Sequence, residues 1–64
     1  MKKLKVGSIA EMKDLGSLVS GEWGHFDFVN GKYKIVAKKV GGKYRIEKIF
    51  DSHSKMYVKE VTAK

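Results

Sequence analysis

The sequence predicts an α+β fold, with a short N-terminal strand, one helix, and then a three- to four-stranded antiparallel β-meander that packs on the helix. Three observations support this prediction. Leu4 and Val6 alternate with lysines, a helix-start motif follows at Ser8, and from Gly21 onward aromatic and β-branched residues are separated by glycine-containing turns. With 64 residues and no cysteine or proline, the chain is expected to form a single domain, 1–64, around a small apolar core.

The predicted helix follows the first strand directly. Ser8-Ile9-Ala10-Glu11 matches the capping box, in which the serine oxygen accepts a backbone N–H and the glutamate reaches back to the serine amide. We therefore expect the helix to begin at Ser8, with Met12 and Leu15 on its apolar side. Its end is open between Gly16, as a left-handed cap, and Gly21.

The rest of the chain predicts four strands, at 22–29, 32–40, 43–50 and 55–62. Asn30-Gly31 and Gly41-Gly42 are expected to form two-residue hairpin turns, because their residues accept positive φ angles. A longer polar turn is expected at 51–54. The register of the last strand is left open.

Two-residue turns fix the register, and the register fixes the two faces of the sheet. Val29 then opposes Lys32, and the face that carries Phe26, Phe28, Ile35 and Ile46 is predicted to be buried. The pairs expected on this core face are Phe28 with Tyr33, Phe26 with Ile35 and Gly24 with Ala37, continuing into Tyr44, Ile46 and Phe50. The opposite face is expected to carry Trp23, His25, Asp27, Lys34, Val36, Lys38, Lys43, Arg45, Glu47 and Ile49.

The charge of the chain indicates a polyanionic partner. Lysine and arginine number 14 against 7 acidic residues, which gives a net charge of +7. Half of the basic residues lie between residues 30 and 50, where Glu47 is the only acid. Basic residues gathered on one surface are typical of proteins that bind nucleic acid.

The candidate binding site is the outer sheet face, with Trp23, Lys34, Lys38, Lys43 and Arg45 as its binding residues. Lysines neutralise phosphates, and an exposed indole, expected across from Lys38, can stack on a base. Lys38 opposite Arg45 would place like charges side by side, a cost that an anionic ligand relieves. A solvated sheet face with one exposed aromatic residue is the structural alternative. Because Arg45 is the only arginine, we expect weakly sequence-specific binding to the nucleic-acid backbone.

Catalysis and metal binding are not expected. His25, Asp27 and His53 complete neither a catalytic triad nor a zinc site, and the glycines do not have phosphate-loop spacing. We therefore predict no enzyme activity, no cofactor and no metal. No apolar segment reaches the roughly 18 residues that a transmembrane helix needs, and the absence of cysteine fits a reducing, cytoplasmic setting.

The predicted function is a small basic nucleic-acid-binding protein, with DNA and RNA both open. The alternative is a protein-interaction module or a small regulator or inhibitor, of the kind that mobile elements encode, whose basic face binds an acidic surface of a larger protein. A monomer or a weak homodimer paired through the first or last strand is expected.

Overall fold

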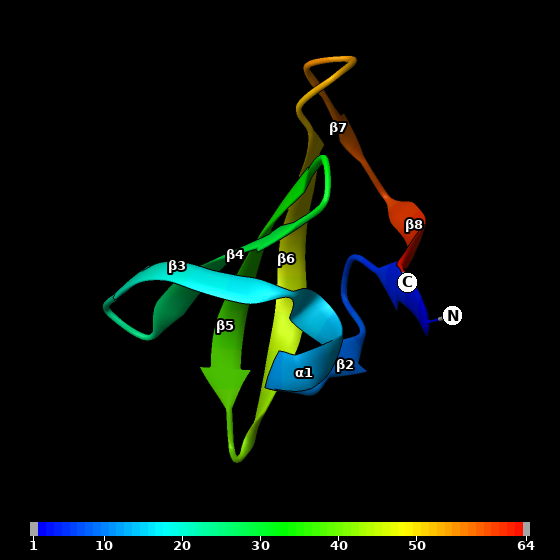
Figure 1. Ribbon diagram of the computed structural model, residues 1–64. Coiled ribbons are helices and arrows are strands. Elements are labelled where there is room, and N and C mark those ends of the chain that lie inside the picture. Colours follow the sequence, from blue (N-terminus) through cyan, green and yellow to red (C-terminus); the bar gives the residue numbers. More distant parts are fainter. Residues whose placement is uncertain (1, 64) are drawn as a thin grey trace.

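The fold is mainly β, and the α+β prediction is wrong. The computed structural model describes residues 2–63 (Figure 1), and strands account for 67% of this part of the chain. Helix is confined, within this part, to the four-residue turn α1 (Met12–Leu15). The strands are β1 (Lys2–Lys5), β2 (Ile9–Ala10), β3 (Ser17–Glu22), β4 (His25–Asn30), β5 (Tyr33–Val40), β6 (Lys43–Asp51), β7 (Met56–Val58) and β8 (Glu60–Ala63).

Six of these strands form one antiparallel sheet organised around β6. One edge of β6 pairs with β5, which continues through β4 to the edge strand β3. The other edge pairs with β2 near the start of β6 and with β7 near its end. After β7, strand β8 pairs with β1, so the first and last strands lie side by side (Figure 1).

The core lies between the inner face of the six-stranded sheet and a second layer formed by the β1–β8 ribbon and α1. Leu4, Leu15 and Val61 come from the second layer and meet the sheet in one cluster. The sheet contributes Ala10, Phe28, Ile35, Ala37, Tyr44, Ile46 and Ile49. Tyr44 lies in edge-to-face contact with both Phe26 and Phe28, at 5.5 and 5.4 Å between ring centroids. The predicted burial is confirmed for Phe28, Ile35 and Ile46, whereas Phe26 is only partly buried.

The helix predicted to begin at Ser8 does not form, and only the four-residue turn α1 is helical there. Ser8 Oγ donates to the Lys5 carbonyl at 2.6 Å, so Ser8 closes a turn and does not cap a helix. Isolated helices of this length are marginal, whereas Ile9 and Ala10 gain a partner strand by pairing with Arg45 and Tyr44. The segment that could have extended the helix, Ser17–Glu22, is instead the edge strand β3.

Gly16, one of the two predicted ends of the helix, does end α1. Its backbone, however, is not in the left-handed conformation that is expected of a cap. Its φ of 106° and ψ of −151° lie in a region that side-chain-bearing residues essentially avoid. A Cβ atom there would overlap the backbone carbonyl of Val29. Glycine therefore lets β3 approach β4 at this point.

The β4–β5 hairpin differs from the predicted register by two residues. Gly31 and Lys32 form the turn, so Asn30 pairs with Tyr33, and Phe28 pairs with Ile35. Backbone N–H and Oγ of Ser52 both donate to the Lys32 carbonyl, which fixes this turn from outside the hairpin. A shift of two residues leaves every side chain on its predicted face, because strand residues alternate with a period of two. The predicted Gly41-Gly42 turn is confirmed, with Val40 opposite Lys43.

Asp51 at the end of β6 is a buried carboxylate that orders the turn into β7. Its Oδ1 accepts the backbone N–H groups of His53 at 2.9 Å and Ser54 at 3.3 Å, and Lys32 Nζ lies 3.7 Å from Oδ2. Burial raises the pKa of Asp51, but these hydrogen bonds and the lysine charge lower it by a larger amount. The pKa of Asp51 therefore lies below its ordinary value. Asp51 therefore has a structural role.

Candidate nucleic-acid interface

The outer face of the six-stranded sheet consists of the side chains that point away from the core. It is crossed by rows of directly paired residues. One row runs from Ile9 on β2 through Arg45, Lys38 and His25 to Glu22 on β3. A parallel row joins Tyr57 on β7 to Phe50, Lys34, Val29 and Ser17. The register thus places cations and aromatic rings from strands distant in the sequence on one surface.

Four of the five predicted site residues lie together on this outer face. Lys34, Lys38, Lys43 and Arg45 are all exposed there, and Lys38 is directly opposite Arg45, as the Gly41-Gly42 turn predicted. Ion pairs between described side chains connect Lys3 with Glu60, Lys13 with Glu11, His25 with Glu47, and Lys32 with Asp51. Among these described side chains, Lys34, Lys38 and Arg45 thus keep charges that no carboxylate neutralises.

Trp23, the fifth predicted residue, lies beside this face and not on it. His25, and not Trp23, is the residue opposite Lys38. Trp23 and Gly24 form the tight turn between β3 and β4, with φ angles of 54° and 79°, and Trp23 is 89% exposed. The hairpin end projects at the left of Figure 1. The shallow surface next to Trp23 is lined by Ser20, Gly21, Glu22, His25 and Asp27, so two carboxylates adjoin the indole.

A β-bulge in β6 changes the composition of the outer face. Val36 pairs with Lys48 while the next residue, Ala37, pairs with Ile46, so Glu47 is the extra residue. Beyond the bulge the alternation is inverted. Ile49, predicted to point outward, is fully buried, and Phe50, predicted to lie in the core, faces outward opposite Lys34.

The bulge adds Lys48 and Phe50 to the candidate site, and the sequence did contain a signal for it. Ile46 and Ile49 are three residues apart, a spacing that an unbroken strand cannot place on one face. The bulge also brings Glu47 to within 3.2 Å of His25 Nε2. The sequence prediction extends strict alternation from Lys43 to Phe50, so it leaves Lys48 and Phe50 off the outer face.

Phe50 and Tyr57 form an aromatic pair on the outer face. They are directly opposite each other on β6 and β7, with ring centroids 5.2 Å apart at an interplanar angle of 65°. Tyr57 is 67% exposed, and Lys48 Nζ lies 6.0 Å from its ring centroid. The pair combines an accessible ring with an adjacent cation, which is the composition of surfaces that stack bases and contact phosphates.

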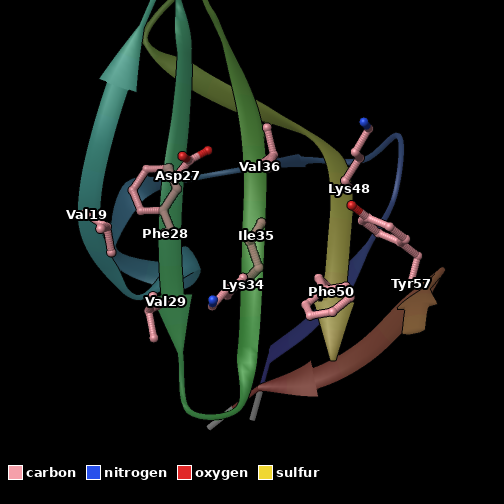
Figure 2. Close-up of a pocket in the computed structure, with 10 residues that line it drawn as sticks. All are labelled: Val19, Asp27, Phe28, Val29, Lys34, Ile35, Val36, Lys48, Phe50 and Tyr57. Atoms are coloured by element: carbon pink, nitrogen blue, oxygen red, sulfur yellow. The ribbon is translucent and has the colours of Figure 1, made fainter. Parts of the chain in front are cut away.

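These side chains border a shallow depression of about 380 Å³ that crosses the sheet from β3 to β7 (Figure 2). Its lining consists of Val19, Asp27, Phe28, Val29, Lys34, Ile35, Val36, Lys48, Phe50 and Tyr57. Figure 2 shows Asp27 toward the β3 side of the depression and Tyr57 at the β7 side. Asp27 Oδ2 accepts a hydrogen bond from Ser20 Oγ at 3.0 Å. The surface is thus apolar at its centre and mixed in charge around it.

Two other classes of site receive no support from the described residues. Across 2–63, no three histidine, aspartate or glutamate side chains are grouped as a metal site would require. In the same range, every helix is too short and too polar to cross a membrane.

Three comparisons with known proteins identified no relative of this chain. A scan against protein-family models, a search of curated proteins and a search of solved structures each gave no match.

Proposed function

We propose that this protein is a small, weakly sequence-specific nucleic-acid-binding protein and that the outer sheet face is its binding surface. The directly paired like charges of Lys38 and Arg45 are the observation that carries the proposal. Placing like charges opposite each other across two strands destabilises a sheet. Phosphate groups of a bound nucleic acid would remove this repulsion.

The distribution of ion pairs supports the same proposal. Glu60 and Asp51 pair with lysines away from the outer face, namely Lys3 on the β1–β8 ribbon and Lys32 in a turn, and Glu47 pairs with His25. Lys34, Lys38 and Arg45 have no such partner among residues 2–63, so their charge is available to a ligand. Lysine makes point-charge contacts with phosphate, which accounts for affinity without sequence preference.

Trp23 is a peripheral contact in this proposal. Its position beyond the end of the Arg45, Lys38 and His25 row lets it reach a base at the margin of the face. Glu22 and Asp27 beside it disfavour a phosphate at that point. Binding, and not catalysis, is the proposed activity, in a reducing compartment that suits a cysteine-free chain.

The test is a salt titration of binding to a labelled oligonucleotide. If about four phosphates are neutralised, the logarithm of affinity for duplex DNA falls against the logarithm of salt concentration with a slope of roughly −3 to −4. Lys38→Gln should reduce this slope by about one unit. Lys5→Gln, the same change on β1 behind the core, is the matched control and should leave the slope unchanged.

The alternative is a protein-interaction module whose basic face binds an acidic protein surface. An affinity for oligonucleotides that does not respond to salt or to Lys38→Gln would contradict the proposal and favour this alternative. Stoichiometric recovery of one acidic protein after nuclease treatment would then identify the partner class.

A further inference from the structure

The aromatic pair on the outer face indicates which form of nucleic acid the surface accepts. Phe50 and Tyr57 stabilise each other as a cross-strand pair. Two half-buried rings would make the same contact. Tyr57 instead remains 67% exposed on β7, at the border of the depression. Its accessible ring suits a planar, aromatic ligand group.

Lys48 adds the second half of a nucleotide site. Its Nζ lies 6.0 Å from the Tyr57 ring centroid, and both residues line the same depression. A base stacked on Tyr57 would carry its phosphate within reach of this flexible, exposed lysine. The two side chains therefore match the two chemical parts of one nucleotide.

Asp27 limits how a nucleic acid could lie on this face. This carboxylate lines the same depression as Lys34 and Lys48 and accepts a hydrogen bond from Ser20. A duplex laid on the sheet presents its phosphates to the surface, so some of them would meet Asp27 and be repelled. A single strand can turn its bases inward over the valines and Asp27 while its phosphates remain near the lysines.

We propose that the ligand of the outer face is single-stranded nucleic acid, with bases turned toward the sheet and one base stacked on Tyr57 against Phe50. This inference rests on the proposed function. Bases in a duplex are already stacked on their neighbours and expose only their edges, so the Tyr57 ring can stack only on an unpaired base.

The experiment compares one oligonucleotide as a single strand and as a duplex at the same salt concentration, with the wild type, Tyr57→Ala, Tyr57→Leu and Tyr57→Phe. We expect the single strand to bind the wild type at least tenfold more tightly. Tyr57→Ala should weaken single-strand binding roughly 5- to 150-fold with an unchanged salt slope, because stacking releases no counterions. Tyr57→Phe should retain most of the affinity. Tyr57→Leu retains an apolar side chain without an aromatic ring and should lose affinity like Tyr57→Ala.

The outcomes separate this inference from the proposed function. Equal affinity for the single strand and the duplex, or an unchanged affinity in Tyr57→Ala and Tyr57→Leu, overturns the single-strand inference. If Lys38→Gln still reduces the salt slope of binding, the proposed function remains intact. Binding to neither form at low salt, with binding to an acidic peptide such as polyglutamate, overturns both.

Discussion

Lys38 on β5 and Arg45 on β6 are direct neighbours across the sheet, and their charges are not neutralised by any carboxylate within residues 2–63. This arrangement lowers the stability of the free protein, and under the proposed function it supplies the charge density for a polyanion. We therefore expect stability and binding to respond in opposite directions to substitutions at this pair.

Lys38→Glu tests this opposition. An opposite charge across from Arg45 should raise the free energy of unfolding by about 0.2–1 kcal/mol in low salt, while binding to nucleic acid becomes weaker. Urea denaturation gives the stability, and a fluorescence anisotropy titration gives the affinity. A variant that is less stable than the wild type and also binds less tightly would show that Lys38 has a structural role.

Trp23 occupies a turn position that favours other residues. Positive φ at both Trp23 and Gly24 corresponds to a type I′ turn, in which asparagine precedes glycine most often, and a bulky residue with positive φ is strained. Trp23→Asn should therefore stabilise the protein by roughly 1 kcal/mol. Thermal unfolding by circular dichroism measures the change. Destabilisation instead would mean that the exposed indole makes contacts that outweigh the strain.

Gly16, which connects α1 to β3, is expected to tolerate substitution poorly. Gly16→Ala should cost roughly 1–3 kcal/mol from the backbone conformation alone, and the overlap with the Val29 carbonyl adds to this cost. Gly7→Ala is a matched control, since Gly7 also has positive φ (93°) but a Cβ there meets no atom within 4 Å. Chemical denaturation of both variants should show the larger loss at Gly16, and an equal loss would contradict the predicted overlap.

Asp51 makes stability depend on pH in the acid range. Its pKa in the folded protein lies below the ordinary value of 3.8, so the folded state favours the charged carboxylate. The resulting stabilisation is complete above the unfolded-state pKa and is lost as the pH falls through the lower, folded-state pKa. Asp51→Asn should remove this part of the acid sensitivity. Urea denaturation of both proteins from about pH 6 to about pH 2 measures it, and parallel pH profiles would argue against the role of Asp51.

The hairpin part of the fold was predictable because the alternation of apolar and polar residues in β4 and β5 is regular. The error of two residues in the β4–β5 turn preserved both faces, so Lys34, Lys38 and Phe28 were placed correctly despite the wrong pairs. The turn itself depends on hydrogen bonds from Ser52, a residue distant in the sequence. Local turn preference alone could not reveal that contact.

The helix and the centre of the site were not predictable from the same local rules. The Ser8 motif predicts a helix wherever no strand competes, but β6 offers Ile9 and Ala10 a pairing edge. Likewise the bulge at Glu47 is a property of the β5–β6 pair, and it moves Phe50 onto the outer face. The aromatic pair of Phe50 with Tyr57 then depends on β7, whose register the sequence left open.

The most direct test of the central claim is a backbone amide NMR titration of the protein with a short single-stranded oligonucleotide at low salt. We expect the largest shift changes at residues of the outer face, namely Lys34, Val36, Lys38, Arg45, Lys48, Phe50 and Tyr57, with little change in the β1–β8 ribbon behind the core. Shift changes concentrated on the ribbon, or none at concentrations of oligonucleotide well above that of the protein, would contradict it.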